Sequence, residues 1–416
     1  MAEAKSHSEE EALHSALPGL PDDLATLCIA RIPSLACIWS VCRAWRRLLL
    51  SSPLFRSVRQ ELRLTTPQWL YVLFKTPIRF EWHAFDPLAQ AWHHLPPLPV
   101  ASDVAFHLSS PSFIGHSYSV QCAASATRLF IVAACRLGEG SAAQEPLPSS
   151  QQLGCVPPHV QTRRRLSVEP ALPSPLIFNA LTNCWSLSSP LRSGPRCWCA
   201  TGVDQSGTLI VASGCGRLWD LHVSKSAECY DPDTDAWTPI AGLHSSKFSG
   251  EAITAVNYQG KLHMVSGRGV FRKAGVLYDP SEARWLDMPR GMRSGWTGSC
   301  VVLDGTLLSL DGATGRLRFY HSHFDTWQYL IEHPMLKGLE QVIAGPGSRL
   351  CGLIRPSSGS NNCIRVARLN PSLAESVADM DFHVDCNLSF VDILAPFPNV
   401  SIVALQLLSG FELGAS

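Results

Sequence analysis

The sequence has little charge and no excess of either sign. Its 34 Lys and Arg residues are balanced by 34 Asp and Glu, and charged residues make up 16% of the chain against 46% hydrophobic residues. A neutral chain is not drawn as a whole to nucleic acid or to a membrane surface. No apolar run reaches the roughly 18 residues of a membrane-spanning helix. The composition therefore favours a well-buried, strand-rich protein.

Zinc-type cysteine pairs and signatures of catalysis are also missing. The 15 cysteines form no Cys-x-x-Cys pair, and Cys197 and Cys199 give a lone Cys-x-Cys. We therefore expect buried, reduced thiols, no metal and no cofactor, in a protein of the cytoplasm or nucleus. Because Gly-x-Ser-x-Gly, His-Glu-x-x-His and phosphate-binding glycine loops do not occur, no enzyme is expected. Residues 1–16 are acidic, lack the apolar stretch of a signal peptide and are expected to be disordered.

Tryptophan, in contrast, recurs in a fixed pattern. Five of the 12 tryptophans follow an aromatic residue by seven positions, whereas an aromatic content of 8% would give about one such pair by chance. The pairs are Phe85 and Trp92, Phe178 and Trp185, Tyr230 and Trp237, Tyr278 and Trp285, and Tyr320 and Trp327. This recurrence indicates an internal repeat.

Each repeat contains enough strand-like segments for one small sheet. Short apolar runs stand before the aromatic positions, at residues 69–74, 128–134, 208–214, 261–267, 306–312 and 349–354. A further apolar stretch precedes most of these runs, so a unit offers four short strands separated by turn residues. Such a sheet cannot bury both faces alone, but radial stacking of the sheets buries them. We predict an all-β propeller over residues 65–408, with six blades.

The spacing also assigns positions within a blade. After Trp185 the paired tryptophans are 52, 48 and 42 residues apart, and the units resemble kelch repeats, which have a period of about 50 residues. The aromatic residue is expected on the third strand, Asp-Pro in the following turn, and the tryptophan at the start of the fourth strand. Both rings can then pack against a neighbouring blade.

Two segments depart from the regular repeat. The first repeat lacks its innermost strand, whereas the chain end has spare strand-like runs, so we expect the C-terminal segment to close the ring on the first blade. Residues 138–172 are rich in Pro, Ser, Gln and Gly and are expected to form a mobile insert. Within it, Ser167 follows Arg163, Arg164 and Arg165 at a spacing favoured by basophilic kinases, which makes it a possible phosphosite.

The N-terminal part has helical rather than strand periodicity. Leu24, Leu27, Cys28, Ala30 and Ile32 fit a short helix that begins at Pro-Asp-Asp and ends at Pro33. A second helix with apolar residues from Leu35 to Leu49 follows, and a third begins near Pro53. About 40 residues cannot easily form a self-sufficient core. We therefore expect this small all-α module to fold against something else.

This module, residues 17–60, resembles an F-box. The family pattern matches Leu20, Pro21, Asp22, Leu24, Ile32, Pro33, Val41, Cys42, Arg43 and Trp45. Trp39 departs from the aliphatic residue that is more usual at its position. With the repeats, the chain resembles plant F-box/kelch-repeat proteins of the Skp-interacting-partner type, which are substrate receptors of SCF (Skp–cullin–F-box) ubiquitin ligases.

The resemblance implies a non-catalytic role in ubiquitin conjugation and protein degradation. An F-box docks on the Skp adaptor, and through it on the cullin and RING subunits, while the propeller holds a protein substrate. The matching positions imply that docking uses Leu20, Pro21, Leu24, Ile32, Pro33, Val41 and Trp45. The alternative is a kelch scaffold or interaction protein without ligase function.

Loop positions predict a polarised propeller within the neutral chain. Loops between the second and third strands, and between successive blades, share one face. This face is expected to hold Arg192, Arg196, Arg217, Lys225, Lys247, Arg268, Arg272, Lys273, Arg290, Arg293, Arg316, Arg318 and Lys337. The opposite face is expected to hold Asp86, Asp204, Asp231, Asp233, Asp235, Asp279, Glu282, Asp304 and Asp325.

The basic face is the candidate binding surface for a substrate, which would then be acidic. The candidate contacts are Arg217, Trp219, Arg268, Phe271, Arg272, Lys273, Arg293 and Trp296. Their aromatic members would anchor the partner and their charges would steer it. A kelch-type copper oxidase is a weaker alternative, because the pairs His93–His94 and His321–His323 are expected to be solvated turn residues away from the central axis.

Overall fold

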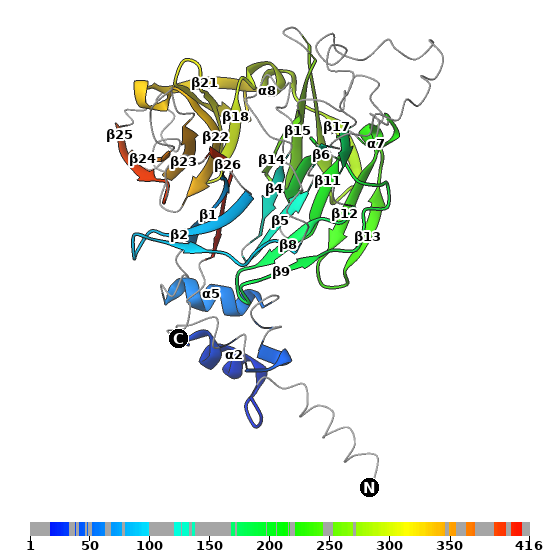
Figure 1. The fold of residues 1–416 in the computed structure, drawn as a ribbon, viewed down its shortest axis with the longest axis vertical. Helices are drawn as coiled ribbons and strands as arrows, with labels where there is room; N and C mark the ends of the chain where they lie inside the picture. The colour runs from blue at the N-terminus through cyan, green and yellow to red at the C-terminus, as the bar shows by residue number, and fades with distance from the viewer. Residues whose placement is uncertain are drawn as a thin grey trace.

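The structure is a computed structural model. It describes residues 17–32, 38, 41–45, 48, 52–62, 68–76, 80–99, 120–125, 127–132, 135–137, 168–170, 173–196, 198–204, 206–214, 216, 221–243, 253–268, 272–345, 349–354, 363–370, 387–396 and 401–409. Six antiparallel sheets of four strands stand around a ring, as blades of a propeller (Figure 1). This confirms the predicted six-bladed architecture. No helix within the described ranges is long and apolar enough to cross a membrane.

Each of the first three blades runs from an innermost strand to an outermost strand. Blade 1 contains β26 (Ser401–Ser409), β1 (Gln68–Lys75), β2 (Phe80–Asp86) and β3 (Ala91–His94). Blade 2 contains β4 (Gln121–Ala124), β5 (Arg128–Val132), β8 (Leu176–Asn179) and β9 (Cys184–Leu187). Blade 3 contains β10 (Ala200–Val203), β11 (Leu209–Ala212), β12 (Ala227–Asp231) and β13 (Ala236–Ile240).

The last three blades follow the same order without interruption. Blade 4 contains β14 (Ile253–Tyr258), β15 (Lys261–Arg268), β16 (Arg272–Asp279) and β17 (Arg284–Asp287). Blade 5 contains β18 (Ser299–Leu303), β19 (Thr306–Asp311), β20 (Arg316–His321) and β21 (Thr326–Glu332). Blade 6 contains β22 (Leu339–Gly345), β23 (Arg349–Ile354), β24 (Cys363–Asn370) and β25 (Asn387–Leu394). A 3-10 turn, η3 (Pro334–Leu336), joins blades 5 and 6.

The C-terminal strand closes the ring, as predicted. β26 is antiparallel to β1, with Leu405 opposite Val72. Its two flanks are bonded to the neighbouring blades, because Gln406 Nε2 donates to the Cys122 carbonyl of blade 2 at 3.1 Å and Gln341 Nε2 of blade 6 donates to the Leu405 carbonyl at 3.2 Å. The edge of β1 that would otherwise be open is therefore fully paired.

The recurring aromatic pair joins each blade to the one before it. The two rings face each other across the third and fourth strands in blades 1 to 5, and their centroids are 4.9 to 5.4 Å apart. In all five blades the tryptophan Nε1 donates to a carbonyl of the preceding blade or its linker, at 2.6 to 3.2 Å. In blade 1 this acceptor is Leu394 of blade 6, so the same contact also closes the ring. Blade 6 has Leu369 opposite Leu388 instead.

The turn between the two aromatic residues has a repeated geometry. Asp86, Asp231 and Asp279 each accept a hydrogen bond at Oδ1 from the backbone N–H two residues later, at 2.8 to 3.0 Å. Such Asx turns are a usual role of Asp before Pro. A non-glycine residue in the left-handed region then precedes the fourth strand in each of blades 1 to 5, with φ between 49° and 51°, namely Gln90, Asn183, Asp235, Ala283 and Asp325.

Helices lie at the two ends of the propeller. α2 (Asp22–Ala30) and α5 (Pro53–Glu61) lie at the end where β1 begins, and α7 (Leu221–Lys225) and α8 (Arg290–Gly295) lie at the opposite end (Figure 1). We call these the α5 end and the α8 end. α8 can approach blade 5 closely because it contains glycine: a Cβ at Gly291 would collide with the Asp325 carbonyl, and one at Gly295 with the Trp327 ring.

The structure describes only the base of the predicted insert. β6 (Cys135–Leu137) pairs with β7 (Val168–Pro170) in a two-stranded sheet. Residues 138–167, with Ser167, lie outside the described residues, as do residues 1–16. The predictions of a mobile insert and a disordered N-terminus therefore stay predictions.

Candidate functional site: two interaction surfaces

The N-terminal helices bury one side and leave a second apolar side exposed. Ala25, Ile29, Ile38, Phe55 and Val58 form a small core between α2 and α5. Leu24 and Cys28, which belong to the apolar pattern of α2, face solvent, and α2 is therefore apolar on two sides. The exposed fraction of Leu24 is 49%.

The docking residues that the sequence predicted fall into two groups. Leu20, Pro21, Leu24 and Val41 are exposed, and Leu20 and Val41 have exposed fractions of 40% and 56%. Ile32 and Trp45 are half-buried and pack against the small core. Pro33 lies outside the described residues. Two further exposed leucines, Leu54 at 39% and Leu62 at 42%, were not predicted, because no periodic pattern marked them as surface positions.

Arg59 fixes the angle between α2 and α5. Its guanidinium Nη1 donates to the Ala30 carbonyl at 3.2 Å and to the Ile32 carbonyl at 2.6 Å, although the residue is only 7% exposed. These carbonyls are at the C-terminal end of α2, where the helix leaves acceptors unsatisfied and favours a cation. Between the two helices, residues 38, 41, 43–45 and 48 are helical, and the intervening positions are not described. A three-helix module therefore stays a prediction.

Among the residues that the structure describes, the α8 end has fewer exposed cations than the sequence predicted. Arg192, Lys225, Arg290 and Lys337 are exposed there. Arg196 is only 1% exposed, and its Nη2 donates to Glu228 Oε1 at 2.7 Å, so it holds the linker between blades 2 and 3 against blade 3. The expected surface role of Arg196 is therefore wrong.

Two further candidates at this end are occupied by internal contacts. Lys273 Nζ donates to the Trp296 carbonyl at 2.6 Å and to the Ser294 carbonyl at 3.3 Å, and burial lowers its pKa. Trp296 has an exposed fraction of 0%, and its Nε1 donates to Thr254 Oγ1. Trp296 is therefore a core residue and not the surface anchor that the sequence predicted.

The other candidates of the basic face are partly described or outside the description. Arg293 is half-buried on α8. The backbones of Arg268 and Arg272 pair with each other across β15 and β16. Arg217, Trp219 and Phe271 lie outside the described residues.

The two predicted charge faces are also less separate than expected. The carboxylates of Asp235 and Asp325 bind the linkers between blades, since they accept hydrogen bonds from the backbone N–H groups of Ser189 and of Gly291 at 2.8 and 2.7 Å. These linkers belong to the segments that had been assigned to the basic face. Some of the predicted acidic surface is therefore structural.

The histidine pairs differ from the prediction of solvated turn residues. His93 and His94 belong to β3, and the ring of His93 stacks on Trp69 at 4.8 Å. The prediction is therefore wrong for His93, whereas His94, at the end of β3, is exposed. His321 ends β20 and is half-buried, whereas His323 stands in the following turn and is exposed, so the prediction holds for His323 alone of these two.

The cysteines behave as free thiols in the part of the chain that the structure describes. Cys199 and Cys351 are buried and Cys122 and Cys300 half-buried, and burial raises the pKa of all four thiols, for Cys199 to about 12. Such thiols are poor nucleophiles. Cys28, Cys42 and Cys184 are exposed, so the expectation that the thiols are buried holds only for some of them.

The described residues thus combine a six-bladed, kelch-like propeller with a short N-terminal helical segment. Comparison with known proteins then places the chain within a family. It is 31% identical over 360 residues to the F-box/kelch-repeat protein SKIP25 of Arabidopsis thaliana, a match that covers 80% of each chain. It is 29% identical to the F-box/kelch-repeat protein At1g22040, over 78% of this chain and 73% of the relative, and 27% identical to the F-box protein AFR, over 73% and 69%, both from the same plant.

The chain belongs to the plant F-box/kelch-repeat proteins. The similarity extends over most of the propeller and not just over a single motif, since it covers 80% of this chain. No protein-family model matches the sequence. Kelch repeats usually contain a double glycine. In this chain it is reduced to a single glycine, as in Val-Ala-Ser-Gly at 211–214, which is one way in which the sequence departs from the general kelch pattern.

Proposed function

We propose that the chain is the substrate-recognition subunit of an SCF-type ubiquitin ligase that acts in the cytoplasm or nucleus. Its relatives are named F-box/kelch-repeat proteins, and an F-box joins such a receptor to the Skp adaptor. The receptor itself is non-catalytic: it holds a protein substrate while the cullin and RING subunits direct ubiquitin transfer.

The observation that carries the proposal is the exposed apolar surface of the N-terminal helices. Leu20, Leu24 and Val41 are between 40% and 56% exposed, although large apolar side chains of a finished domain are usually buried. Burial of one leucine side chain in an interface is worth about 1.5–3 kcal/mol. Three such residues therefore supply enough apolar surface for a specific contact with an adaptor.

The positions of the helices and loops fit a receptor that binds the adaptor and the substrate at separate surfaces. The helices lie at the α5 end, and the loops with α7 and α8 lie at the far end of the ring (Figure 1). An adaptor on the helices leaves the α8 end accessible to a substrate. We propose that substrate binds there, through the exposed cations Arg192, Lys225, Arg290 and Lys337, so that acidic partners are steered to this end. Arg293 of α8, and Arg268 and Arg272 as predicted from the sequence, are further candidates.

The docking proposal is tested by reconstitution with purified Skp adaptor, cullin and RING subunits. Leu24→Asp places a charge on the proposed docking surface and is expected to abolish capture of the adaptor and assembly of the ligase. Leu187→Asp is the matched control, because Leu187 is also 49% exposed but lies on β9 of the propeller. Adaptor capture by the Leu24→Asp variant at the level of the control would refute the receptor role and favour a scaffold without ligase function.

The substrate surface is tested separately by charge reversal with the adaptor contact intact. Arg290→Glu with Lys337→Glu changes the α8 end, and Glu282→Lys with Asp233→Lys changes exposed acids of the outer turns. The set of proteins whose ubiquitination depends on the receptor should shrink for the first variant and persist for the second. The reverse result would place substrate on the acidic turns.

A further inference from the structure

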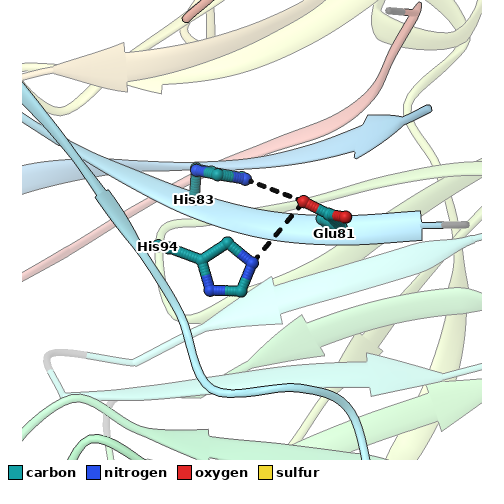
Figure 2. Close-up of side chains that lie close together, drawn as sticks. All are labelled: Glu81, His83 and His94. Carbon is teal, nitrogen blue, oxygen red and sulfur yellow. Dashed lines mark hydrogen bonds and ion pairs between the residues drawn. The ribbon is translucent and has the colours of Figure 1, made fainter.

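Three potential metal ligands converge on the outer strands of blade 1 (Figure 2). Glu81 and His83 are two residues apart on β2, so their side chains project from the same face of the sheet. His94 of β3 is the direct cross-strand partner of His83. The strand pairing therefore brings a carboxylate and two imidazoles together, although the sequence predicted no metal site.

The distances between these groups match those around a small tetrahedral ion. Glu81 Oε2 is 3.3 Å from His83 Nε2 and 3.5 Å from His94 Nε2. Zinc bonds of about 2.0–2.2 Å at tetrahedral angles separate neighbouring ligand atoms by about 3.3–3.5 Å. All three ligand atoms lie within 4.8 Å of one another, so only the separation between the imidazoles needs to shorten.

The surroundings hold one imidazole in place and leave the other open to solvent. His83 is 4% exposed, and its ring packs edge-on against Phe74 and against His94, with centroids 5.5 and 4.7 Å away. The side chain of His94 is 48% exposed, so an ion can enter from solvent and keep water in a fourth position.

The ligand types select the class of metal. Two imidazole nitrogens and one carboxylate oxygen suit zinc and its first-row neighbours, whereas magnesium and calcium favour six or more oxygen ligands. We propose that Glu81 Oε2, His83 Nε2 and His94 Nε2 bind one divalent zinc-class ion at the rim of blade 1. Such an ion would tie the start of β2 to the end of β3, in the blade where the ring closes.

The test is calorimetric titration of Zn²⁺ into the full chain after removal of metals with a chelator. One equivalent is expected to bind to the native chain and to raise its melting temperature, because an ion that binds only the folded state stabilises it. Glu81→Gln and His94→Ala should each weaken this binding by about 100-fold or more, since loss of a mere second-shell partner already costs 10–100-fold. Both variants are expected to fold, because Glu81→Gln is isosteric and His94→Ala alters a half-exposed side chain.

His323→Ala is the matched control, because His323 is an exposed histidine of blade 5 that also has a histidine neighbour. This variant should bind Zn²⁺ as tightly as the native chain does. Replacement of Zn²⁺ by Co²⁺ separates this site from the cysteines, because thiolate ligands give an intense near-ultraviolet charge-transfer band that imidazole and carboxylate ligands do not. Equal affinity in the native chain and in both ligand variants, a thiolate band, or no binding to the native chain would each overturn the proposal.

Discussion

The propeller and the N-terminal helices use their apolar side chains in opposite ways. In the propeller the large rings point into seams between blades; Trp237 is 2% exposed and Trp296 0%. In the helices, Leu24 and Val41 of a much shorter segment remain 49% and 56% exposed. The ring can satisfy its own surfaces because its last strand pairs with its first blade, whereas two short helices have too little interior to do so. The difference fits the proposal that the helices, unlike the closed ring, are completed by a partner.

The strongest test of the closed ring is to reopen it. A chain that ends at Pro396 lacks β26 and exposes the inner edge of β1. We expect loss of the cooperative melting transition and self-association through the free edge, measured by size-exclusion chromatography and thermal denaturation. A chain that ends at Ser409 is the control and should behave as the full chain does. A monomeric, equally stable product of the shorter truncation would show that closure by β26 is not needed.

A buried ion pair should have the next largest effect. Glu228 accepts from Arg196 Nη2 at 2.7 Å and from the backbone N–H groups of Arg192 and Ser193, and both charged side chains are 0% exposed. Glu228→Ala leaves the guanidinium buried without its counter-charge, which typically costs about 3–5 kcal/mol. Urea denaturation should show this loss in the free energy of unfolding.

The control for this prediction is an exposed pair of the same kind. Arg316 and Glu332 are joined at 2.6 Å, but their side chains are 47% and 38% exposed. Glu332→Ala should therefore leave the urea midpoint almost unchanged. Equal effects of the two substitutions would mean that the Glu228 pair is not a clamp between linker and blade.

The tryptophan contacts between blades should have a smaller effect each. Trp237→Phe keeps an aromatic ring against Tyr230 but removes the hydrogen bond from Nε1 to the Ser189 carbonyl, which is 2.8 Å long. We expect a loss of about 1 kcal/mol, the usual net value of one hydrogen bond, with a modest addition for the smaller ring. Tyr329→Phe, at a 61% exposed position, is the control. No difference between the two in urea denaturation would show that ring packing alone joins the blades.

The fold could be predicted from the sequence because its signal repeats. Tyr230 and Trp237 recur in equivalent form in five blades, so one chance match could not mislead. The spare apolar runs at the chain end likewise identified the closing strand. The repeated residues are those that pack inside each blade, so the sequence pattern predicted the interior of the blades.

The surfaces were harder to predict because surface position depends on neighbours that the sequence does not place. Arg196 and Trp296 stand in loops but are buried, one by Glu228 and the other by the packing of α8 against blade 5. Leu24 belongs to a helical apolar pattern and is exposed, and only the F-box resemblance, not the pattern itself, marked it for docking. The cluster of Glu81, His83 and His94 was missed because the register of β2 with β3, and not the spacing along the chain, brings His94 beside His83.

The smallest expected change in stability concerns the exposed side of α2, and it tests directly whether exposed and buried apolar residues of this helix have different roles. Leu24→Ala removes an apolar side chain that is already 49% exposed, so the free energy of unfolding should change by no more than about 0.5 kcal/mol. Ile29→Ala, on the buried side of the same helix at 1% exposure, should cost the module about 2–5 kcal/mol.

Addition of Skp adaptor should stabilise the two variants to different extents. The Ile29→Ala variant should regain stability as the adaptor binds, because a partner that binds only the folded state stabilises it, whereas the Leu24→Ala variant should gain much less from the adaptor than the native chain does. Hydrogen exchange of residues 22–30 with and without adaptor measures both effects. If adaptor protects the Leu24→Ala helix as fully as the native one, the exposed leucine is not part of the docking surface, and the apolar side of α2 must have another partner.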